Sequence, residues 1–186
     1  MPSRLTPLQE RVLAVLAPMT PRWTLTGGGA LAGFHLGHRT TRDLDLFWHG
    51  HAELGELPRE VMRRLEAAGL TTDVVQTTPA FERLRVRESG EELIVDLVAE
   101  RVPTVSAPLE FRVGSQTVLV DSPHEILVNK LAALYSRWAI RDLVDVKTLV
   151  EAGGDLDRAL ADAPRKDGGF SPPNLAWVLR TTNFAP

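Results

Sequence analysis

Acidic and apolar side chains alternate over residues 43–48, which read Asp-Leu-Asp-Leu-Phe-Trp. Side chains two apart on a strand point to the same face of a sheet. The spacing therefore predicts a half-buried strand with Asp43 and Asp45 side by side and with Leu44 and Leu46 in the core. Two neighbouring carboxylates repel each other unless a cation lies between them. A hard divalent cation with oxygen ligands, magnesium above all, resolves that conflict.

Three consecutive glycines precede this strand. Residues 23–26 are typical of a short strand, Gly27, Gly28 and Gly29 follow it, and a helix is expected directly behind them over residues 30–36. A glycine run at a strand-to-helix turn exposes backbone N–H groups that can hold phosphate oxygens. A phosphate cradle followed by metal-binding carboxylates indicates phosphoryl or nucleotidyl transfer, in which two metal ions bracket an in-line displacement.

A third carboxylate, Asp96, lies within an apolar strand predicted over residues 93–98. An unpaired acid there would cost on the order of several kcal/mol in lost hydration. If this strand lies beside the strand of the two aspartates, Asp96 joins the metal ligands and can accept the proton of an attacking hydroxyl. The alternative is a salt bridge to Arg83 or Arg85 on the neighbouring strand of a hairpin.

The remaining patterns divide the chain into a mixed α/β half and a helical half. Thr6-Pro7-Leu8-Gln9 and Ser122-Pro123-His124-Glu125 both predict helix starts, because each has a capping hydroxyl, a proline at the first helical position and a side chain that can reach back. The expected class is α/β (α+β), a mixed sheet flanked by helices. Helices are expected over residues 6–16, 57–68, 122–137, 142–151, 155–161 and 174–179, and further strands over 71–77, 81–87, 111–113 and 117–120.

Composition narrows the chemistry. The chain of 186 residues has no cysteine, which excludes disulfides, zinc–thiolate sites and cysteine nucleophiles. No stretch approaches the roughly 18 to 20 apolar residues of a membrane helix, and the N-terminal segment lacks the apolar block of a signal peptide. A cytoplasmic protein with no membrane partner is expected. The net charge of −3 means that any nucleic-acid binding depends on a local patch.

These motifs resemble those of the AbiEii-like nucleotidyltransferases, the toxins of type IV toxin–antitoxin systems within the DNA polymerase β-like superfamily. Four motifs carry the resemblance, which runs from about residue 23 to residue 151. They are residues 27–31, residues 37–47, residues 121–134 centred on Lys130, and Arg137 with residues 141–145.

The resemblance implies a magnesium-dependent transfer of a nucleoside monophosphate from a nucleoside triphosphate to an acceptor hydroxyl, with pyrophosphate released. Two magnesium ions, an RNA acceptor such as a tRNA end, and a cognate antitoxin protein follow from it. It also implies a nucleotidyltransferase-type sheet domain over residues 1–121 and a helical subdomain over residues 122–186 that completes the active site. Gly29 stands where the family usually has a hydroxyl residue, which leaves open which two glycines face the phosphates.

Cationic side chains complete the expected site. Lys130 and Arg137 are seven apart and share a helix face, where they could bind triphosphate oxygens or lie on a solvated surface. Asp142 could orient Lys130 or Arg39 through an ion pair, whereas Asp145 is expected to be structural. The expected catalytic residues are Asp43, Asp45, Asp96, Lys130 and Asp142, the nucleotide-binding residues are Gly27, Gly28, Gly29, Arg39, Thr41, Lys130 and Arg137, and the metal ligands are Asp43, Asp45 and Asp96.

Two other functions stay open. The acceptor could be a small hydroxylated molecule such as an antibiotic, or the chain could be a silent nucleotide-binding or partner-binding module on the same fold. The second is disfavoured because a silent module has no use for so many costly charges. The histidine pairs 35/38 and 49/51 lack a third ligand in sequence, and Trp138 is the one tryptophan considered for base stacking.

Overall fold

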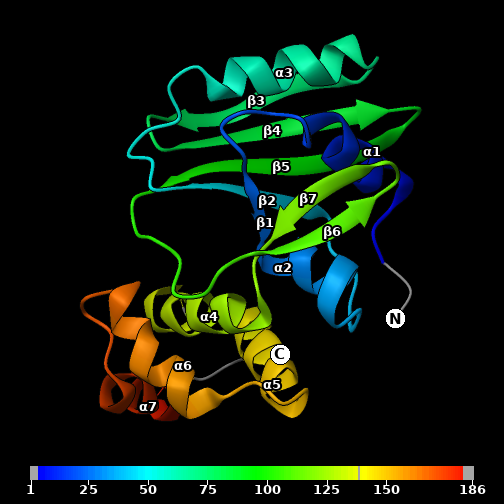
Figure 1. Cartoon of the computed structure of the whole chain (residues 1–186). Helices are drawn as coiled ribbons and strands as arrows, with labels where there is room; N and C mark the ends of the chain where they lie inside the picture. Colours follow the sequence, from blue (N-terminus) through cyan, green and yellow to red (C-terminus); the bar gives the residue numbers. More distant parts are fainter. Residues whose placement is uncertain (1–3, 138, 182–186) are drawn as a thin grey trace. The chain divides into compact units, whose positions relative to one another are not determined.

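The computed structural model describes residues 4–137 and 139–181, so Trp138 lies outside the described residues. The chain divides into two compact units (Figure 1). The sheet unit comprises the chain up to Pro103 together with Pro108–Asp121, and the helical unit comprises Thr104–Ala107 and the chain from Ser122 onward. Within the described residues, no helix is long and apolar enough to cross a membrane.

The sheet unit is built on a mixed sheet of seven strands in the order β3-β4-β5-β2-β1-β7-β6. Strand β1 pairs antiparallel with β2 and parallel with β7, and β2 pairs parallel with β5. The other neighbours are antiparallel hairpins. The strands are β1 (Thr24–Thr26), β2 (Asp43–His49), β3 (Thr71–Thr78), β4 (Phe81–Glu88), β5 (Glu91–Glu100), β6 (Leu109–Val113) and β7 (Gln116–Val120).

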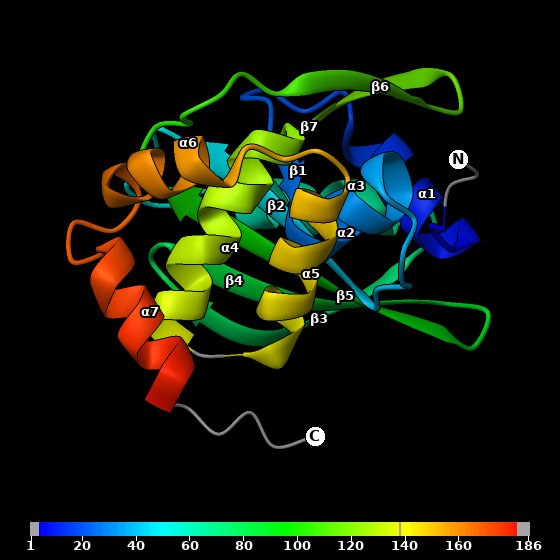
Figure 2. The same cartoon turned by 90° about the horizontal axis from the view of Figure 1, so that it is seen from below.

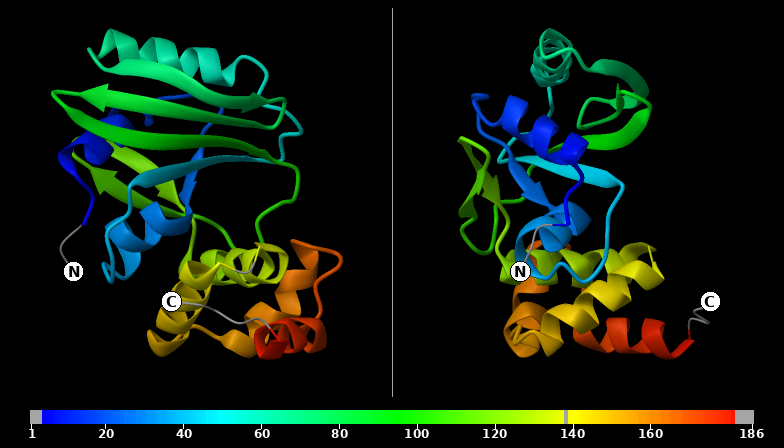
Figure 3. Two further views of the ribbon diagram at one scale, coloured as in Figure 1. Left: turned by 180° about the vertical axis from the view of Figure 1, so that it is seen from behind. Right: turned by 90° about the vertical axis from the view of Figure 1, so that its right-hand side faces the viewer.

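Helices α1 (Pro7–Leu16) and α3 (Leu57–Ala67) contact each other and lie on the same side of the sheet (Figure 3). The capping box at the start of α1 is confirmed, because Thr6 and Gln9 exchange backbone-to-side-chain hydrogen bonds of 3.2 and 2.8 Å. Apolar side chains of both helices and of the strands form the core, which confirms the expected α/β class. The buried members include Val12, Leu13, Leu16, Leu44, Leu46, Val61, Leu65, Leu84, Val95 and Leu97.

The connection after β1 differs from the expectation. Helix α2 (Gly27–Ala30) begins at Gly27 itself and continues as a π-helical turn, Leu31–His35, so the glycines form the first helical turn and not a loop ahead of it. Gly27 has a φ of 62°, a left-handed conformation that glycine adopts without a steric penalty. This one residue lets the chain turn directly from strand to helix.

The helical unit is arranged around α4 (Pro123–Arg137), which contacts α5 (Ile140–Glu151), α6 (Leu156–Asp162) and α7 (Pro172–Thr181). Figure 2 shows α4 with α5 on one side and α7 on the other. A short 3₁₀ turn, Ala163–Arg165, follows α6.

The second predicted capping box forms only in part. The Ser122 hydroxyl accepts the Glu125 N–H at 3.1 Å, as expected, but the Glu125 side chain does not return to Ser122. The buried carboxylate instead accepts the N–H groups of Val105 and Ser106 at 2.7 and 3.0 Å, and it lies 2.5 Å from Lys166 Nζ. Glu125 therefore fixes the Thr104–Ala107 segment within the helical unit.

Candidate active site

Strand β2 presents Asp43 and Asp45 on one half-exposed face, while Leu44 and Leu46 on the other face are fully buried. The alternation predicted from sequence is therefore the one observed. Asp45 is in register with Thr26 on β1 and with Asp96 on β5. The three carboxylates consequently lie on neighbouring positions of the same sheet face.

Asp96 does not stand alone in this row, because Arg83 lies opposite it on β4. The guanidinium donates two hydrogen bonds, from Nε at 2.8 Å and from Nη2 at 2.7 Å. Asp96 is 6% exposed, so the pair is strongly shielded on its acidic side. The salt bridge weighed as an alternative from the hairpin pattern is the arrangement found here.

The electrostatic influence of this face reaches Arg83. Its hydrogen bonds with Asp96, opposed by burial and reinforced by the charges of Asp96, Asp43 and Asp45, raise the pKa of Arg83 above its ordinary value. Within residues 4–137 and 139–181, no group of three or more histidine or acidic side chains is gathered as a metal site. The oxygen donors that could hold a divalent cation are therefore the adjacent pair on β2, with Asp96 held by Arg83.

The glycines differ in what they face. A Cβ on Gly27 would lie well under 3.0 Å from Asp45 Oδ2, and a Cβ on Gly28 would lie 3.0 Å from Arg39 Nη2 and 3.2 Å from Thr41 Oγ1. A Cβ on Gly29 would instead meet leucine methyl groups on the apolar side. The polar face of the turn is thus bordered by Gly27 and Gly28.

Thr41 anchors the segment that enters β2. Its buried hydroxyl donates to the Asp43 carboxylate, and its carbonyl oxygen accepts a 3.1 Å hydrogen bond from Gln9 Nε2 on α1. Arg39, two residues earlier, donates to the carbonyl oxygen of Thr40 at 3.4 Å. The Thr41–Asp43 bond fixes the orientation of one carboxylate of the pair. Sequence reasoning missed Gln9 in this role, since its capping function gave no sign of a second contact.

The helical unit holds a second charged cluster, formed by Lys130, Arg137, Asp142 and Asp145. Lys130 Nζ lies 2.8 Å from a carboxylate oxygen of each aspartate, and both aspartates are fully buried. Arg137 donates to Asp142 from Nε at 2.7 Å and from Nη2 at 2.9 Å, while half of its side chain stays exposed. The shared face inferred from the seven-residue spacing of the two cations is therefore the one observed.

The two cations determine the protonation of Asp142. Burial pushes the pKa of this carboxyl upward, but the hydrogen bonds and charges of Arg137 and Lys130 outweigh burial and hold the pKa below its ordinary value. Asp142 is accordingly ionised at neutral pH. From the sequence, Asp142 was expected to have a role in the site and Asp145 a structural role. Both aspartates contact Lys130 at the same distance of 2.8 Å, so this contact does not distinguish the two roles.

Sequence reasoning also missed a buried group after β7. The Asp121 carboxylate is fully buried, neither of its oxygens has a hydrogen-bond partner in the described part of the chain, and His49 Nε2 lies 3.7 Å away. His35 Nε2 lies 2.8 Å from the Asp121 carbonyl oxygen, and burial lowers the pKa of His35. An acidic residue directly behind an apolar strand was the available signal.

A family of known proteins matches most of the chain. The family profile described as "Nucleotidyl transferase AbiEii toxin, Type IV TA system" matches residues 11–179. No protein with a curated description matches the sequence significantly.

Solved structures share the fold at low sequence identity. MenT4, a nucleotidyltransferase toxin from Mycobacterium tuberculosis, is 21% identical with a TM-score of 0.66, and the match covers 84% of this chain and 61% of that one. JHP933 from Helicobacter pylori is 22% identical with a TM-score of 0.58, covering 83% and 70%. The antibiotic-resistance factor ANT(2″)-Ia is 16% identical with a TM-score of 0.58, covering 82% and 85%.

Proposed function

Because the chain belongs to the family of AbiEii nucleotidyltransferase toxins, we propose that it moves a nucleoside monophosphate from a nucleoside triphosphate to an acceptor hydroxyl and releases pyrophosphate. The observation that carries this proposal is the pair of carboxylates on β2, Asp43 and Asp45, bordered by a glycine whose missing side chain leaves room beside Asp45. The match to the family profile confirms the family and the enzyme class that the sequence motifs predicted.

The β2 pair suits magnesium by its chemistry. Asp43 and Asp45 offer hard oxygen donors side by side at partial exposure, and a Cβ at Gly27 would fill the space next to Asp45. When bound there, magnesium would neutralise charge on the phosphates during transfer. A cofactor requirement for magnesium, with two ions, is therefore part of the proposal.

Other residues of the sheet unit are proposed to bind the phosphates and to activate the attacking hydroxyl. Gly27 and Gly28 offer backbone N–H groups to phosphate oxygens, with Arg39 as a cationic contact and Thr41 holding Asp43 in position. Asp96 takes the proton of the attacking hydroxyl, or acts as a third metal ligand, once its carboxylate turns from Arg83. Arg83 would then be available to the developing negative charge.

In the helical unit, we propose that cationic side chains act as phosphate ligands. Arg137 is half exposed while it pairs with Asp142, so its guanidinium is accessible to a phosphate oxygen. Lys130 is almost fully buried between two carboxylates, so its contact with phosphate competes with ion pairs that already exist. Arg137 is thus the better phosphate ligand of the two.

The acceptor proposed is an RNA end, with tRNA as the first candidate, in the cytoplasm where nucleoside triphosphates and RNA are available. An antitoxin encoded as the partner of a type IV toxin is proposed to oppose this activity. A small hydroxylated acceptor is the second candidate, because the fold is shared with an antibiotic-resistance factor as well as with a toxin.

Label transfer tests the function. The chain is incubated with magnesium, total bacterial RNA and each of the four α-labelled nucleoside triphosphates, in parallel with Asp43→Ala and Asp45→Ala. Label is expected in RNA only with the unmutated chain. Asp73→Ala is the matched control, since Asp73 is an exposed acid on β3 paired with Arg87.

Each result has a defined meaning. Equal labelling by the chain and both β2 variants would contradict the mechanism. Magnesium-dependent nucleotide binding without labelled RNA would move the acceptor to a small hydroxylated molecule, tested next with labelled triphosphate and hydroxylated antibiotics. No transfer to either acceptor class would favour a silent module.

A further inference from the structure

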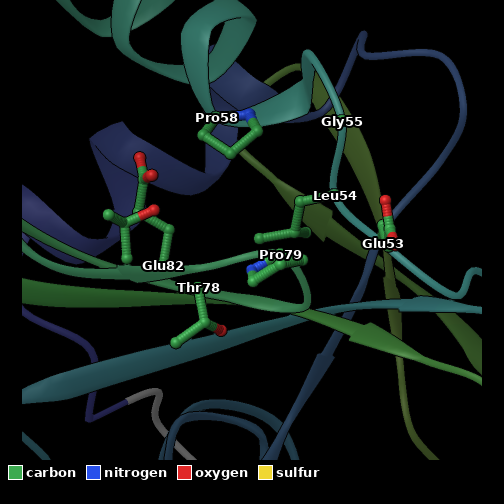
Figure 4. Close-up of a pocket in the computed structure, with 8 residues that line it drawn as sticks. Glu53, Leu54, Gly55, Pro58, Thr78, Pro79 and Glu82 are labelled. Atoms are coloured by element: carbon green, nitrogen blue, oxygen red, sulfur yellow. The ribbon is translucent and has the colours of Figure 1, made fainter.

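A pocket lies on the α3 side of the sheet, away from the β2 carboxylates. It has a volume of about 460 Å³ and is formed by the segment before α3, the first turn of that helix and the turn between β3 and β4 (Figure 4). Glu82 of β4 lines it. Consecutive residues of a strand point to opposite faces, and Arg83 points to Asp96, so Glu82 points away from the proposed transferase site.

The pocket contains a buried charge without a partner. Glu82 is 8% exposed, and in the described part of the chain its carboxylate forms no hydrogen bond or ion pair, with Oε1 completely shielded. The arginines of α3 are occupied by Glu56 and Glu60 of the same helical segment. A buried carboxylate without a partner is costly, because nothing replaces its lost hydration.

The lining selects the class of ligand. None of the lining residues is basic, and the exposed Glu53 adds a second negative charge. Leu54, Pro58 and Pro79 provide apolar surface for a carbon stem. An alkylammonium or guanidinium ion can use both the carboxylate and the apolar surface, whereas a hard divalent cation would use oxygen ligands alone. The chemistry therefore fits an organic cation.

The pocket is also preformed. The Leu54 N–H donates to the carbonyl oxygen of Pro79 at 2.8 Å, which holds the segment before α3 against the β3–β4 turn. The Thr78 hydroxyl donates to the carbonyl oxygen of Phe81 at 3.3 Å and closes the same turn. A ligand would therefore meet walls that need no reordering, which favours binding.

We propose that this pocket binds an alkylammonium or guanidinium group, whose charge pairs with Glu82 and whose stem lies on Leu54, Pro58 and Pro79. The same chemistry can come from a free amine or from a lysine or arginine side chain of a partner polypeptide. The site is independent of the proposed transferase chemistry, since it uses the opposite face of the sheet.

A titration of the full chain tests the site by amide chemical shifts. The probe is n-butylammonium chloride, and its neutral counterpart is n-butanol in sodium chloride of equal ionic strength. Saturable shifts are expected at Leu54, Gly55 and Thr78 with the cation alone. Glu82→Gln should weaken binding roughly tenfold or more, whereas Glu53→Gln at the exposed rim should weaken it less than about threefold.

Two further probes identify the source of the cation. Tighter binding of spermidine than of Nα-acetyl-lysine methylamide supports a free amine, and the reverse order supports a side chain of a partner. No saturable shift with any cationic probe, or equal affinity in Glu82→Gln, overturns the proposal. Thermal unfolding without ligand gives a second readout. Glu82→Gln should raise the midpoint, and a lower midpoint would contradict the proposal by showing that Glu82 is already paired.

Discussion

The aspartate pairs of the two units differ in burial. On β2, Asp43 and Asp45 share one half-exposed face as neighbouring like charges. In the helical unit, Asp142 and Asp145 are fully buried, and each lies 2.8 Å from Lys130. The first arrangement keeps its carboxylates partly hydrated, whereas the second encloses its carboxylates and its lysine away from water.

This difference predicts that the β2 aspartates matter mainly for ligand binding and that the buried cluster around Lys130 matters mainly for stability. Partly exposed carboxylates keep much of their hydration, so the loss of one of these charges should affect chemistry more than folding. A buried ion-pair cluster behaves differently, because the loss of one member leaves the others uncompensated in a low-dielectric surrounding. The comparison therefore predicts which variants unfold and which merely fail to act.

The largest expected effect on stability comes from Lys130→Met. Removal of this cation leaves two fully buried carboxylates, so the free energy of unfolding should fall by about 3–5 kcal/mol. Asp43→Asn on β2 should change it by less than about 1 kcal/mol. Urea unfolding followed by circular dichroism measures both.

A double variant guards against simple misfolding. Lys130→Met combined with Asp145→Asn should recover part of the lost stability, because one of the two unpaired charges is gone. Equal stability of Lys130→Met and the unmutated chain would erase the distinction between the two units.

Gly27→Ala should have the next largest effect. An alanine there has a positive φ and a Cβ that meets Asp45 Oδ2, so we expect a loss of about 1–3 kcal/mol and weaker magnesium binding. Gly114→Ala is the matched control, since Gly114 has a φ of 58° and open space around a Cβ. Isothermal titration with magnesium and urea unfolding of both variants separate the contact from the backbone strain, and identical results for the two would remove the close approach from the site.

Arg137→Gln tests whether the helical cluster also binds nucleotide. Loss of a half-exposed guanidinium should weaken triphosphate affinity roughly tenfold, equivalent to about 1.4 kcal/mol. The Arg158→Gln variant, which alters another exposed arginine of the same unit, should leave affinity unchanged. Fluorescent-nucleotide titration reports the difference. Unchanged affinity in Arg137→Gln would leave the cluster with a structural role alone.

The smallest effect concerns pH. The pKa of Asp142 is lowered in the folded chain, so its ionised form stabilises the fold above the unfolded pKa of about 4, and this contribution is lost as the pH falls through the lower folded value. The stability difference between the unmutated chain and Asp142→Asn should be constant from pH 7 to about pH 4.5 and shrink below it. A difference that grows on acidification would reverse the assigned direction.

Local signals accounted for most elements of the fold. The alternation around Asp43, the capping box at Thr6 and the proline at position 123 each depend on residues within a few positions, and each element is present. The helix start at Gly27 was placed too late, because a glycine run signals a turn but not which glycine takes the positive φ. Local pattern cannot settle that choice.

Long-range partners limited the prediction of side-chain roles. The reach of Glu125 back to Ser122 failed because two amides from another part of the chain and Lys166 are better partners. Pairing of Asp96 with Arg83 was foreseen as one of two outcomes, since the hairpin register permits it but does not compel it. The unpaired carboxylate of Glu82 gave no signal at all, because alternation alone cannot reveal a missing partner.

The hydrogen bonds from Val105 and Ser106 to Glu125 determine where the chain can be divided into separate fragments. The polypeptide enters the helical unit after Pro103, leaves it at Pro108 and enters it again at Ser122. A gene fragment that starts at Ser122 would therefore lack the two amides that Glu125 binds, and recombination at that boundary would transfer an incomplete unit. After a single proteolytic cut near residue 121, the first fragment would still carry the Thr104–Ala107 segment, and Glu125 of the second fragment would bind that segment noncovalently.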